Sequence, residues 1–155
     1  MITVEPATHD DIPRLVELEE GLFREDAGLH ERFADVTWPS REGHEDFVQL
    51  LTNPSTLVVH ARVDAIIVGF AVGYLQPSSP TRLPVTYGVL RSLYVEPSRR
   101  NAGVGSRLTA VFVGWARANG CVEAHVESYA ANEDAQRFYA RHGFEAVSVS
   151  RMLPL

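Results

Sequence analysis

The sequence predicts an α/β protein in which helices cover one mixed β-sheet. Apolar runs rich in β-branched residues alternate along the chain with segments whose apolar residues recur at helical spacing. Proline and glycine separate these segments. Their order is strand, helix, helix, three strands, helix, strand, helix and strand, which is typical of a layered α/β sandwich. The 155 residues fit one domain, so we expect residues 1–155 to form a single unit.

The N-terminal part predicts a strand and a helix with a defined start. Ile2 to Glu5 alternates between apolar and polar residues, as a short strand does. Thr8 and Asp11 have the spacing of a capping box, which marks a helix start. The helix is expected to end at Gly21. Its apolar stripe consists of Ile12, Leu15, Val16 and Leu18.

The middle of the chain predicts a second helix and a hairpin. Leu22 to Ser40 is polar and indicates no particular element, whereas Arg41 to Leu51 has helical spacing. Two runs rich in β-branched residues, Leu57 to Val63 and Ala65 to Leu75, meet at Asp64 and predict a hairpin. The apolar face of the second helix is expected to hold Phe47, Leu50 and Leu51.

The next part predicts an exposed loop, a long strand and a helix. Gln76 to Pro84 contains three prolines and two serines, which is typical of a loop. Val85 to Val95 is expected to be the strand. Gly105 to Asn119 has helical spacing, and Gly120 is its stop signal. The buried side of this helix is expected to hold Leu108, Val111, Phe112 and Trp115.

The C-terminal part predicts a strand, a short helix and a closing strand. These elements are expected at Val122 to Glu127, Glu133 to His142 and Ala146 to Leu153. Cys121 precedes the first of them and is expected to be a small, partly buried residue at the mouth of the strand.

Composition narrows the class of protein. The net charge of −6 argues against nucleic acid as the main partner. No apolar run approaches the ~18 residues that a membrane span needs, and the N-terminus lacks the pattern of a signal peptide. One cysteine excludes an internal disulfide and says nothing against the cytosol. We expect a cytoplasmic protein with no membrane partner. All fourteen basic residues are arginine, a residue that binds planar anions by bidentate contact. The six histidines lack the spacing of a metal site, and no metal is expected.

A glycine motif after the long strand predicts an anion site. It reads Arg100-x-x-Gly103-x-Gly105, and helical spacing follows it directly. The exposed N–H groups and the dipole of a helix N-terminus favour negative charge, and glycine allows the backbone to approach a phosphate. The motif is neither a Walker loop nor the dinucleotide fingerprint, because neither the G-K-[ST] nor the G-x-G-x-x-G pattern is present. We therefore expect a ligand that carries a pyrophosphate.

A second motif lies further along the chain and strengthens this interpretation. It reads Asn132-x-x-Ala135-x-x-Phe138-Tyr139-x-x-x-Gly143-Phe144. With both motifs in this order, the chain resembles the GNAT superfamily of N-acetyltransferases. The resemblance is strong from Val85 to Phe144 and elsewhere rests on the order of the elements.

The resemblance implies a fold and an activity. The fold would be a central mixed, mostly antiparallel sheet of about seven strands flanked by helices. Strands 4 and 5 would splay apart and leave a cleft for the pantetheine arm. The activity would move an acetyl group from acetyl-CoA to a primary amine of a small molecule, by direct attack in a ternary complex. Many members of that family dimerise, so a homodimer is one oligomeric state that the resemblance implies.

The resemblance assigns the cofactor to the first motif and its neighbours. Backbone N–H groups would hold the pyrophosphate, and Arg99 would reach a phosphate from outside. Leu93 and Val95 match strand positions that pair with pantetheine, where a backbone N–H polarises the thioester carbonyl. Asn132 matches a position that contacts the pantetheine arm. The residues expected at the pyrophosphate are Arg100, Gly103, Val104, Gly105 and Ser106.

Tyr139 is the candidate for side-chain catalysis. It matches the family's tyrosine beside the thioester sulfur, and a neutral phenol can give a proton to the leaving thiolate. The alternative is that Phe138 and Tyr139 are only core aromatics of a helix.

The sequence does not decide which residue acts as the general base that deprotonates the amine. Relatives often carry a glutamate on the fourth strand, where this chain has Arg91, which cannot act as a base. Deprotonation could run through water to Glu127, His125 or an acid of the N-terminal helices, and Tyr87 and Glu96 are further candidates. Alternatively, Arg91 binds a carboxylate or phosphate of the acceptor, or is a solvated edge residue.

The sequence does not decide the acceptor substrate either, because an acidic segment favours cations whereas Arg91 would favour anions. Glu17 to Asp46 carries ten acidic residues and three arginines. This segment would attract cationic amines, unless it is simply a solvated helical face. A non-catalytic module that binds or senses acyl-CoA, and an enzyme that acetylates a protein or peptide amine, are the alternative functions.

Overall fold

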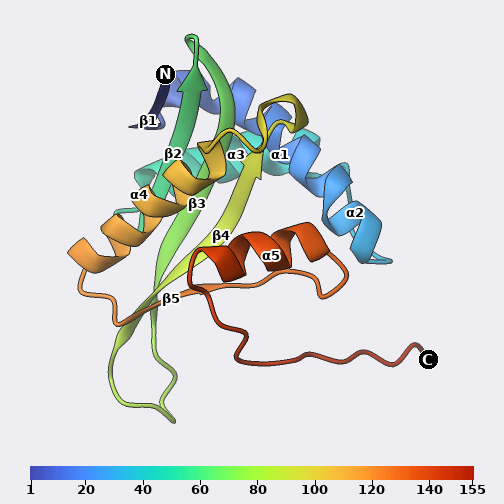
Figure 1. The fold of residues 1–155 in the computed structure, drawn as a ribbon, viewed down its shortest axis with the longest axis vertical. Coiled ribbons are helices and arrows are strands. Elements are labelled where there is room, and N and C mark those ends of the chain that lie inside the picture. The colour runs from blue at the N-terminus through green and yellow to red at the C-terminus, as the bar shows by residue number, and fades with distance from the viewer.

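The computed structural model describes residues 1–155 as one five-stranded sheet with helices on both faces (Figure 1). The strands are β1 (Ile2–Pro6), β2 (Thr56–Val63), β3 (Ile66–Pro77), β4 (Thr86–Val95) and β5 (Glu123–Val126). The helices are α1 (Ile12–Glu25), α2 (Ala27–His30), α3 (Trp38–Thr52), α4 (Val104–Ala118) and α5 (Glu133–Arg141). Short 3₁₀ turns, His9–Asp11 and Pro97–Arg99, precede α1 and α4. None of the helices has the length and apolar character to cross a membrane.

The sheet is mixed, as predicted. Its order is β1-β2-β3-β4-β5, with antiparallel neighbours from β1 to β4 and a parallel pairing of β4 with β5. The predicted hairpin is confirmed, since Val63 pairs with Ile66 across a two-residue turn. Both turn residues have positive φ, 51° at Asp64 and 66° at Ala65. This backbone twist suits the right-handed twist of the flanking strands.

Two apolar layers hold the helices to the sheet. One lies between α1, α3 and the sheet, and it includes Leu15, Phe47 and Phe70. The other lies between α4 and the opposite face, and it includes Leu108 and Phe112. Figure 1 shows α4 on one side of the strands and α1 and α3 on the other. The strands between them are therefore buried on both faces, which explains their continuous apolar runs.

Several boundaries differ from the sequence prediction. The first helix does not end at Gly21 but continues to Glu25, because Gly21 packs tightly against the Tyr94 side chain of β4. Residues 22–40, left without a predicted element, contribute the end of α1, the whole of α2 and the start of α3. On α4, Val111 is 37 % exposed rather than buried, because the buried residues follow strict one-turn spacing. They are Val104, Leu108, Phe112 and Ala116, with Thr109 beside them.

The strand count is lower than the resemblance implied. The sheet has five strands, so the expectation of about seven is wrong. The closing strand predicted at Ala146 to Leu153 does not form, and residues 145–155 run as an exposed segment beyond α5. The apolar alternation of this segment is real, but no neighbouring strand pairs with it.

A β-bulge in β4 opens the sheet. Val72 pairs with Ser92 and Gly73 with Leu90, so Arg91 has no partner on β3. An extra residue of this kind bends the strand and increases its twist. On its other side, β4 pairs with β5 only from Tyr87 to Leu90. The two strands therefore separate at the bulge, and residues 92–95 have no strand on that edge.

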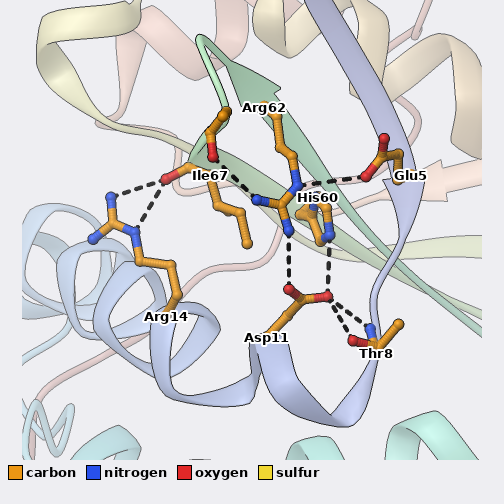
Figure 2. A network of polar contacts seen from close by, with 8 residues as sticks. Glu5, Thr8, Asp11, Arg14, His60, Arg62 and Ile67 are labelled. Atoms are coloured by element: carbon orange, nitrogen blue, oxygen red, sulfur yellow. Dashed lines mark hydrogen bonds and ion pairs between the residues drawn. The ribbon is translucent and has the colours of Figure 1, made fainter.

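A polar network ties the start of α1 to the sheet (Figure 2). The Asp11 carboxylate accepts hydrogen bonds from the backbone N–H of Thr8 at 2.8 Å and from Arg62 Nη2 at 3.1 Å. It also lies 3.2 Å from Nε2 of His60, whose side chain is 2 % exposed. Burial raises the pKa of Asp11, but the Thr8 hydrogen bonds and the charges of His60 and Arg62 outweigh it and lower that pKa. Asp11, the second residue of the predicted capping box, therefore also anchors β2.

Replacing Asp11 should destabilise the protein by roughly 2–4 kcal/mol. Asp11→Ala leaves the buried His60 and the Arg62 guanidinium without their shared acceptor. Urea unfolding followed by circular dichroism measures the change. Asp10→Ala is the matched control, since Asp10 is exposed and next in the chain. Equal midpoints for the two variants would show that the network adds nothing to stability.

Candidate active site

A cleft opens where β4 and β5 separate. Its volume is about 700 Å³, and α1, β4, β5, the start of α4 and α5 contribute to its walls. Such volumes are typical of ligand sites in proteins. The predicted site residues that line it are Arg91, Leu93, Val95, Arg100, Gly105, Glu127, Asn132 and Tyr139.

The start of α4 forms one end of the cleft. Gly103 has φ of +90°, in the left-handed region, and places the first turn of α4 directly after the bend. A Cβ on Gly105 would lie 3.2 Å from the Phe138 ring, so only glycine fits between α4 and α5 without displacement. The backbone of this turn is thus available at the cleft, and its N–H groups and dipole favour an anion.

The remaining residues of the first motif surround this turn. Val104 is buried and offers only its backbone to a ligand. The Ser106 hydroxyl lies 2.9 Å from Nε2 of His142, which links α4 to the end of α5. Arg99, Gly103, Val104 and Ser106 do not line the cleft, whereas Arg100 and Gly105 do. At the predicted anion site, the structure therefore offers the backbone of Gly105 and the side chain of Arg100 to the cleft.

Arg100 reaches across the mouth of the cleft. Its Nε donates to the carbonyl of Val95 at 2.8 Å, and its Nη2 lies 3.3 Å from both carboxylate oxygens of Glu25. Its guanidinium also stands over the Tyr94 ring, 5.3 Å from the centroid. Since its side chain is 41 % exposed, the exposed part of the guanidinium remains accessible to an anion.

Tyr139 sits on α5 and faces the cleft. Its ring packs edge-on against Phe138 and Phe144, with centroids 5.3 and 5.6 Å away. Burial, together with the negative charge of Asp26, raises the pKa of Tyr139 to about 12. The phenol is therefore neutral at physiological pH and can donate a proton. It is half-buried, packs on neighbouring aromatic rings and also lines the cleft.

Asn132 connects α5 to the end of α1. Its Oδ1 accepts from the backbone N–H of Ala135 at 3.1 Å, which caps α5. Its Nδ2 donates to Asp26 at 2.9 Å. This bond holds Asp26 in the cleft wall, close enough to Tyr139 for the charge of Asp26 to raise the pKa of Tyr139.

Two more acids of the N-terminal helices contact tyrosines around the cleft. The Tyr94 hydroxyl donates to Glu25, and the Tyr129 hydroxyl donates to Glu31. Burial and the bond to Glu25 raise the pKa of Tyr94 to about 12. The bond to Glu31 and burial raise the pKa of Tyr129 to about 12. The sequence analysis named no individual acid here, although Asp26 lies one helical turn beyond Leu22 on the apolar stripe of α1.

Arg91, at the bulge, is held by two carboxylates. Its Nη2 donates to Asp46 at 2.6 Å and lies 3.6 Å from Glu19. Arg91 lines the cleft with 30 % of its side chain exposed. Its guanidinium is therefore paired with Asp46 within the protein, while the residue itself remains exposed at the cleft.

Glu19 is a buried acid that the sequence analysis did not single out. It is 1 % exposed, and its Oε2 has no hydrogen-bond partner. Burial raises the pKa of Glu19 to about 7; Arg91 opposes this rise and Asp46 adds to it. The signal was present in the sequence, because Glu19 follows Leu15 and Leu18 on the apolar face of α1.

The chain is similar in sequence to one known protein family and in fold to several solved structures. The chain matches the sequence model of the acetyltransferase (GNAT) family over residues 15–144. No curated protein matches the sequence.

Solved structures with the same fold share little sequence with this chain. A mutant of the BH1408 protein of Bacillus halodurans has a TM-score of 0.89 at 20 % identity, covering 99 % of both chains. The aminoglycoside N-acetyltransferase AAC(6')-Iy, in complex with a CoA bisubstrate analogue, has a TM-score of 0.79 at 18 % identity, covering 100 % of this chain and 98 % of that chain. A ribosomal-protein-alanine N-acetyltransferase from Brucella melitensis has a TM-score of 0.71 at 18 % identity, covering 100 % and 99 %.

The buried Glu19 should make stability depend on pH. Its pKa rises on folding from 4.5 to about 7, so the folded state holds the proton more tightly than the unfolded state. The stability that it contributes is fully present below about pH 4.5 and is lost as the pH rises through about 7, by on the order of 3 kcal/mol. Glu19→Gln removes this titration, so its urea midpoint should fall less than that of the wild type between about pH 5 and pH 8.

Glu20→Gln serves as the matched control, because Glu20 is the next residue on α1 and is not fully buried. It should keep the wild-type dependence on pH. Parallel pH curves for the wild type and Glu19→Gln would rule out Glu19 as the titrating group.

Proposed function

Because the chain belongs to the GNAT acetyltransferase family, we propose that it transfers an acetyl group from acetyl-CoA to a primary amine of a small molecule in the cytoplasm. The observation that carries this proposal is the position of Tyr139, a neutral phenol in the cleft wall where β4 has lost its strand neighbour. The start of α4, the open edge of β4 and Tyr139 all line this one cleft, which supports an anion site, an arm-binding edge and a proton donor within reach of one ligand. These are the three features that a CoA thioester requires.

The first turn of α4 is the proposed pyrophosphate site. The fit rests on Gly103 and Gly105, since a side chain at either would strain the bend or collide with Phe138. Their backbone N–H groups, with those of Val104 and Ser106, would hold the phosphates. Arg100 would contact them from the mouth of the cleft, and Arg99 from outside it.

The edge of β4 beyond the bulge is the proposed site of the pantetheine arm and the thioester. Leu93 and Val95 line the cleft there, and no strand pairs with this edge. Their backbone groups can bind an extended arm as a strand would, and an N–H aimed at the carbonyl oxygen would stabilise the charge that develops on it. Asn132 would contact the arm from the opposite wall.

The proposed reaction is direct attack in a ternary complex. The amine nitrogen forms a bond to the thioester carbon while the carbon–sulfur bond breaks. The Tyr139 hydroxyl gives its proton to the departing thiolate. The ammonium form of the acceptor first releases one proton to water, and after attack the nitrogen gives up a second proton through water to Asp26 or Glu127. That second proton then returns through water to the Tyr139 phenolate.

A cationic acceptor is favoured over one with a carboxylate. Asp26 and Glu25 line the cleft wall formed by the end of α1, so a positive amine would find negative charge there. Arg91 already donates to Asp46, which offsets its charge toward an acceptor. The name of one protein with the same fold, an aminoglycoside N-acetyltransferase, is consistent with a small-molecule amine.

Loss of the Tyr139 hydroxyl should slow acetyl transfer and leave cofactor binding intact. Tyr139→Phe keeps the ring contacts with Phe138 and Phe144 but removes the proton donor. We expect kcat to fall by roughly 10- to 1,000-fold. Thiol release from acetyl-CoA measures the rate, and calorimetry measures the affinity for CoA.

Tyr74→Phe is the control, since it removes a phenol of β3 that does not line the cleft. An unchanged rate in Tyr139→Phe would exclude Tyr139 as the acid. CoA binding by a wild-type protein that shows no turnover with any amine would favour the sensing module instead.

A panel of amines tests the acceptor. We expect turnover with polycations such as spermidine and aminoglycosides rather than with amino acids or short peptides. Asp26→Asn should raise KM for the polycations by roughly tenfold, because it removes one charge contact while keeping the bond to Asn132. Turnover confined to peptides would instead indicate a protein or peptide acceptor, and turnover confined to carboxylate-bearing amines would put Arg91 in the site.

A further inference from the structure

Three charged residues meet behind the wall of the cleft, at the bulge of β4. They are Glu19 of α1, Asp46 of α3 and Arg91 of β4, and together they form the bulge cluster. Arg91 Nη2 donates to Asp46 at 2.6 Å and lies 3.6 Å from Oε1 of Glu19. Arg91 lines the cleft, whereas Glu19 is 1 % exposed and does not line it. A charge on Glu19 can therefore act on a ligand in the cleft without touching it.

The surroundings of Glu19 hold neither of its charge states firmly. Its Oε2 has no hydrogen-bond partner, and its Oε1 is too far from Arg91 for a hydrogen bond. Gly43 of α3 faces Oε2, since a Cβ there would lie 3.5 Å from it, and glycine offers no side chain that could pair with it. Burial raises the pKa of Glu19 to about 7. The protonated and the ionised form are therefore both populated near neutral pH.

Two charged groups act on Glu19 from the elements packed against α1. Arg91 of β4 favours the ionised form, and Asp46 of α3 favours the protonated form. The strand β3, which also packs against α1, contributes apolar side chains to this layer. On α3, His44 packs edge-on against His9 and is thus engaged elsewhere. The charge of Glu19 is therefore coupled mainly to its two partners in the cluster.

The net charge of the bulge cluster follows the proton on Glu19. With Glu19 protonated, the charges of Arg91 and Asp46 cancel, and the cluster is neutral. With Glu19 ionised, the cluster carries one negative charge directly behind a residue that lines the cleft. Salt screens a buried charge less than an exposed one. The cluster therefore presents a negative potential to the cleft only when Glu19 has lost its proton.

We propose that the charge state of Glu19 sets the affinity of the cleft for a cationic amine, with tight binding to the ionised form and weak binding to the protonated form. The inference rests on the proposed function for the cationic nature of the acceptor. Glu19 touches neither substrate, so it is a positioning residue that acts through Arg91 and Asp46. Because linkage is reciprocal, an amine that prefers the ionised form must also displace the proton of Glu19 when it binds.

Calorimetric titration of the full-length protein with putrescine, with CoA present, measures this coupling without turnover. The ammonium groups of this diamine resemble that of lysine and stay charged up to about pH 9, so a change of pH below that value acts on the protein. We expect binding to be roughly three- to tenfold tighter at about pH 8 than at about pH 6, as for one unit charge at about 10 Å. Titrations in two buffers of different ionisation enthalpy should show that binding releases a fraction of a proton near pH 7.

Glu19→Gln fixes the bulge cluster in its neutral form. Its affinity for putrescine should equal that of the wild type at low pH, with no dependence on Glu19 titration and no released proton. Circular dichroism checks the fold, which should persist because glutamine has the shape of the protonated acid. Glu20→Gln is the matched control, since it removes one charge from the next residue of α1. It should keep the wild-type pH dependence and proton release.

Asp46→Asn provides a second test that leaves Glu19 itself unchanged. It removes the charge that favours the protonated form, so the midpoint of the pH dependence should move to lower pH. An unchanged midpoint would contradict the role of the cluster.

Two outcomes of the titrations would overturn the inference. One is an equal pH dependence in the wild type and Glu19→Gln, and the other is no binding of putrescine at either pH. Failure of the proposed function has a different signature, because thiol release from acetyl-CoA reports it separately. A protein that binds putrescine with the expected pH dependence but releases no thiol with any amine would support the inference and reject acetyl transfer.

Discussion

The extra residue in β4 is the constraint on which the rest of the site depends. Because Arg91 has no partner on β3, the strand bends there and β5 cannot follow it beyond Leu90. β4 then has an edge without a strand neighbour inside the fold, and the start of α4 and the helix α5 line the cleft at this edge. The bulge residue is an arginine clamped by Asp46 and Glu19, so the same position that opens the sheet also attaches α1 and α3 to it.

Polar contacts then set the width of the cleft. Asp26 with Asn132, and Glu31 with Tyr129, connect the N-terminal helices to the loop between β5 and α5. These contacts lie at the surface or half-buried, where a hydrogen bond adds only about 1 kcal/mol. The apolar layers around Phe47 and Phe112 are continuous and rigid by comparison. The walls of the cleft therefore pack on buried apolar layers, whereas only a few weak hydrogen bonds connect the walls to each other. This arrangement suits a site that must admit two substrates.

Local chemistry explains how much could be predicted from the sequence. The hairpin at Asp64, the stop at Gly120 and the helices that contain the two motifs follow from residues close together in the chain, and the structure confirms these elements. The bulge could not be predicted, because it depends on the register between β3 and β4. The strand expected at Ala146 to Leu153 has the right pattern, but pairing depends on a partner that a pattern does not specify. For the site, the sequence located the walls formed by β4, α4 and α5, whereas Asp26 and Glu19 required the packing of α1.

The position of Arg100 has a consequence for the order in which the two substrates arrive. In the free protein, Glu25 is shared between Arg100 and the Tyr94 hydroxyl. In the proposed role of Arg100, a pyrophosphate would draw the guanidinium toward itself and leave Glu25 with less positive charge nearby. The wall that faces the amine would then become more negative only after the nucleotide has bound. Such a protein would hold a cationic amine weakly when empty and more tightly when loaded, which makes a compulsory sequence with the thioester first the natural kinetic scheme.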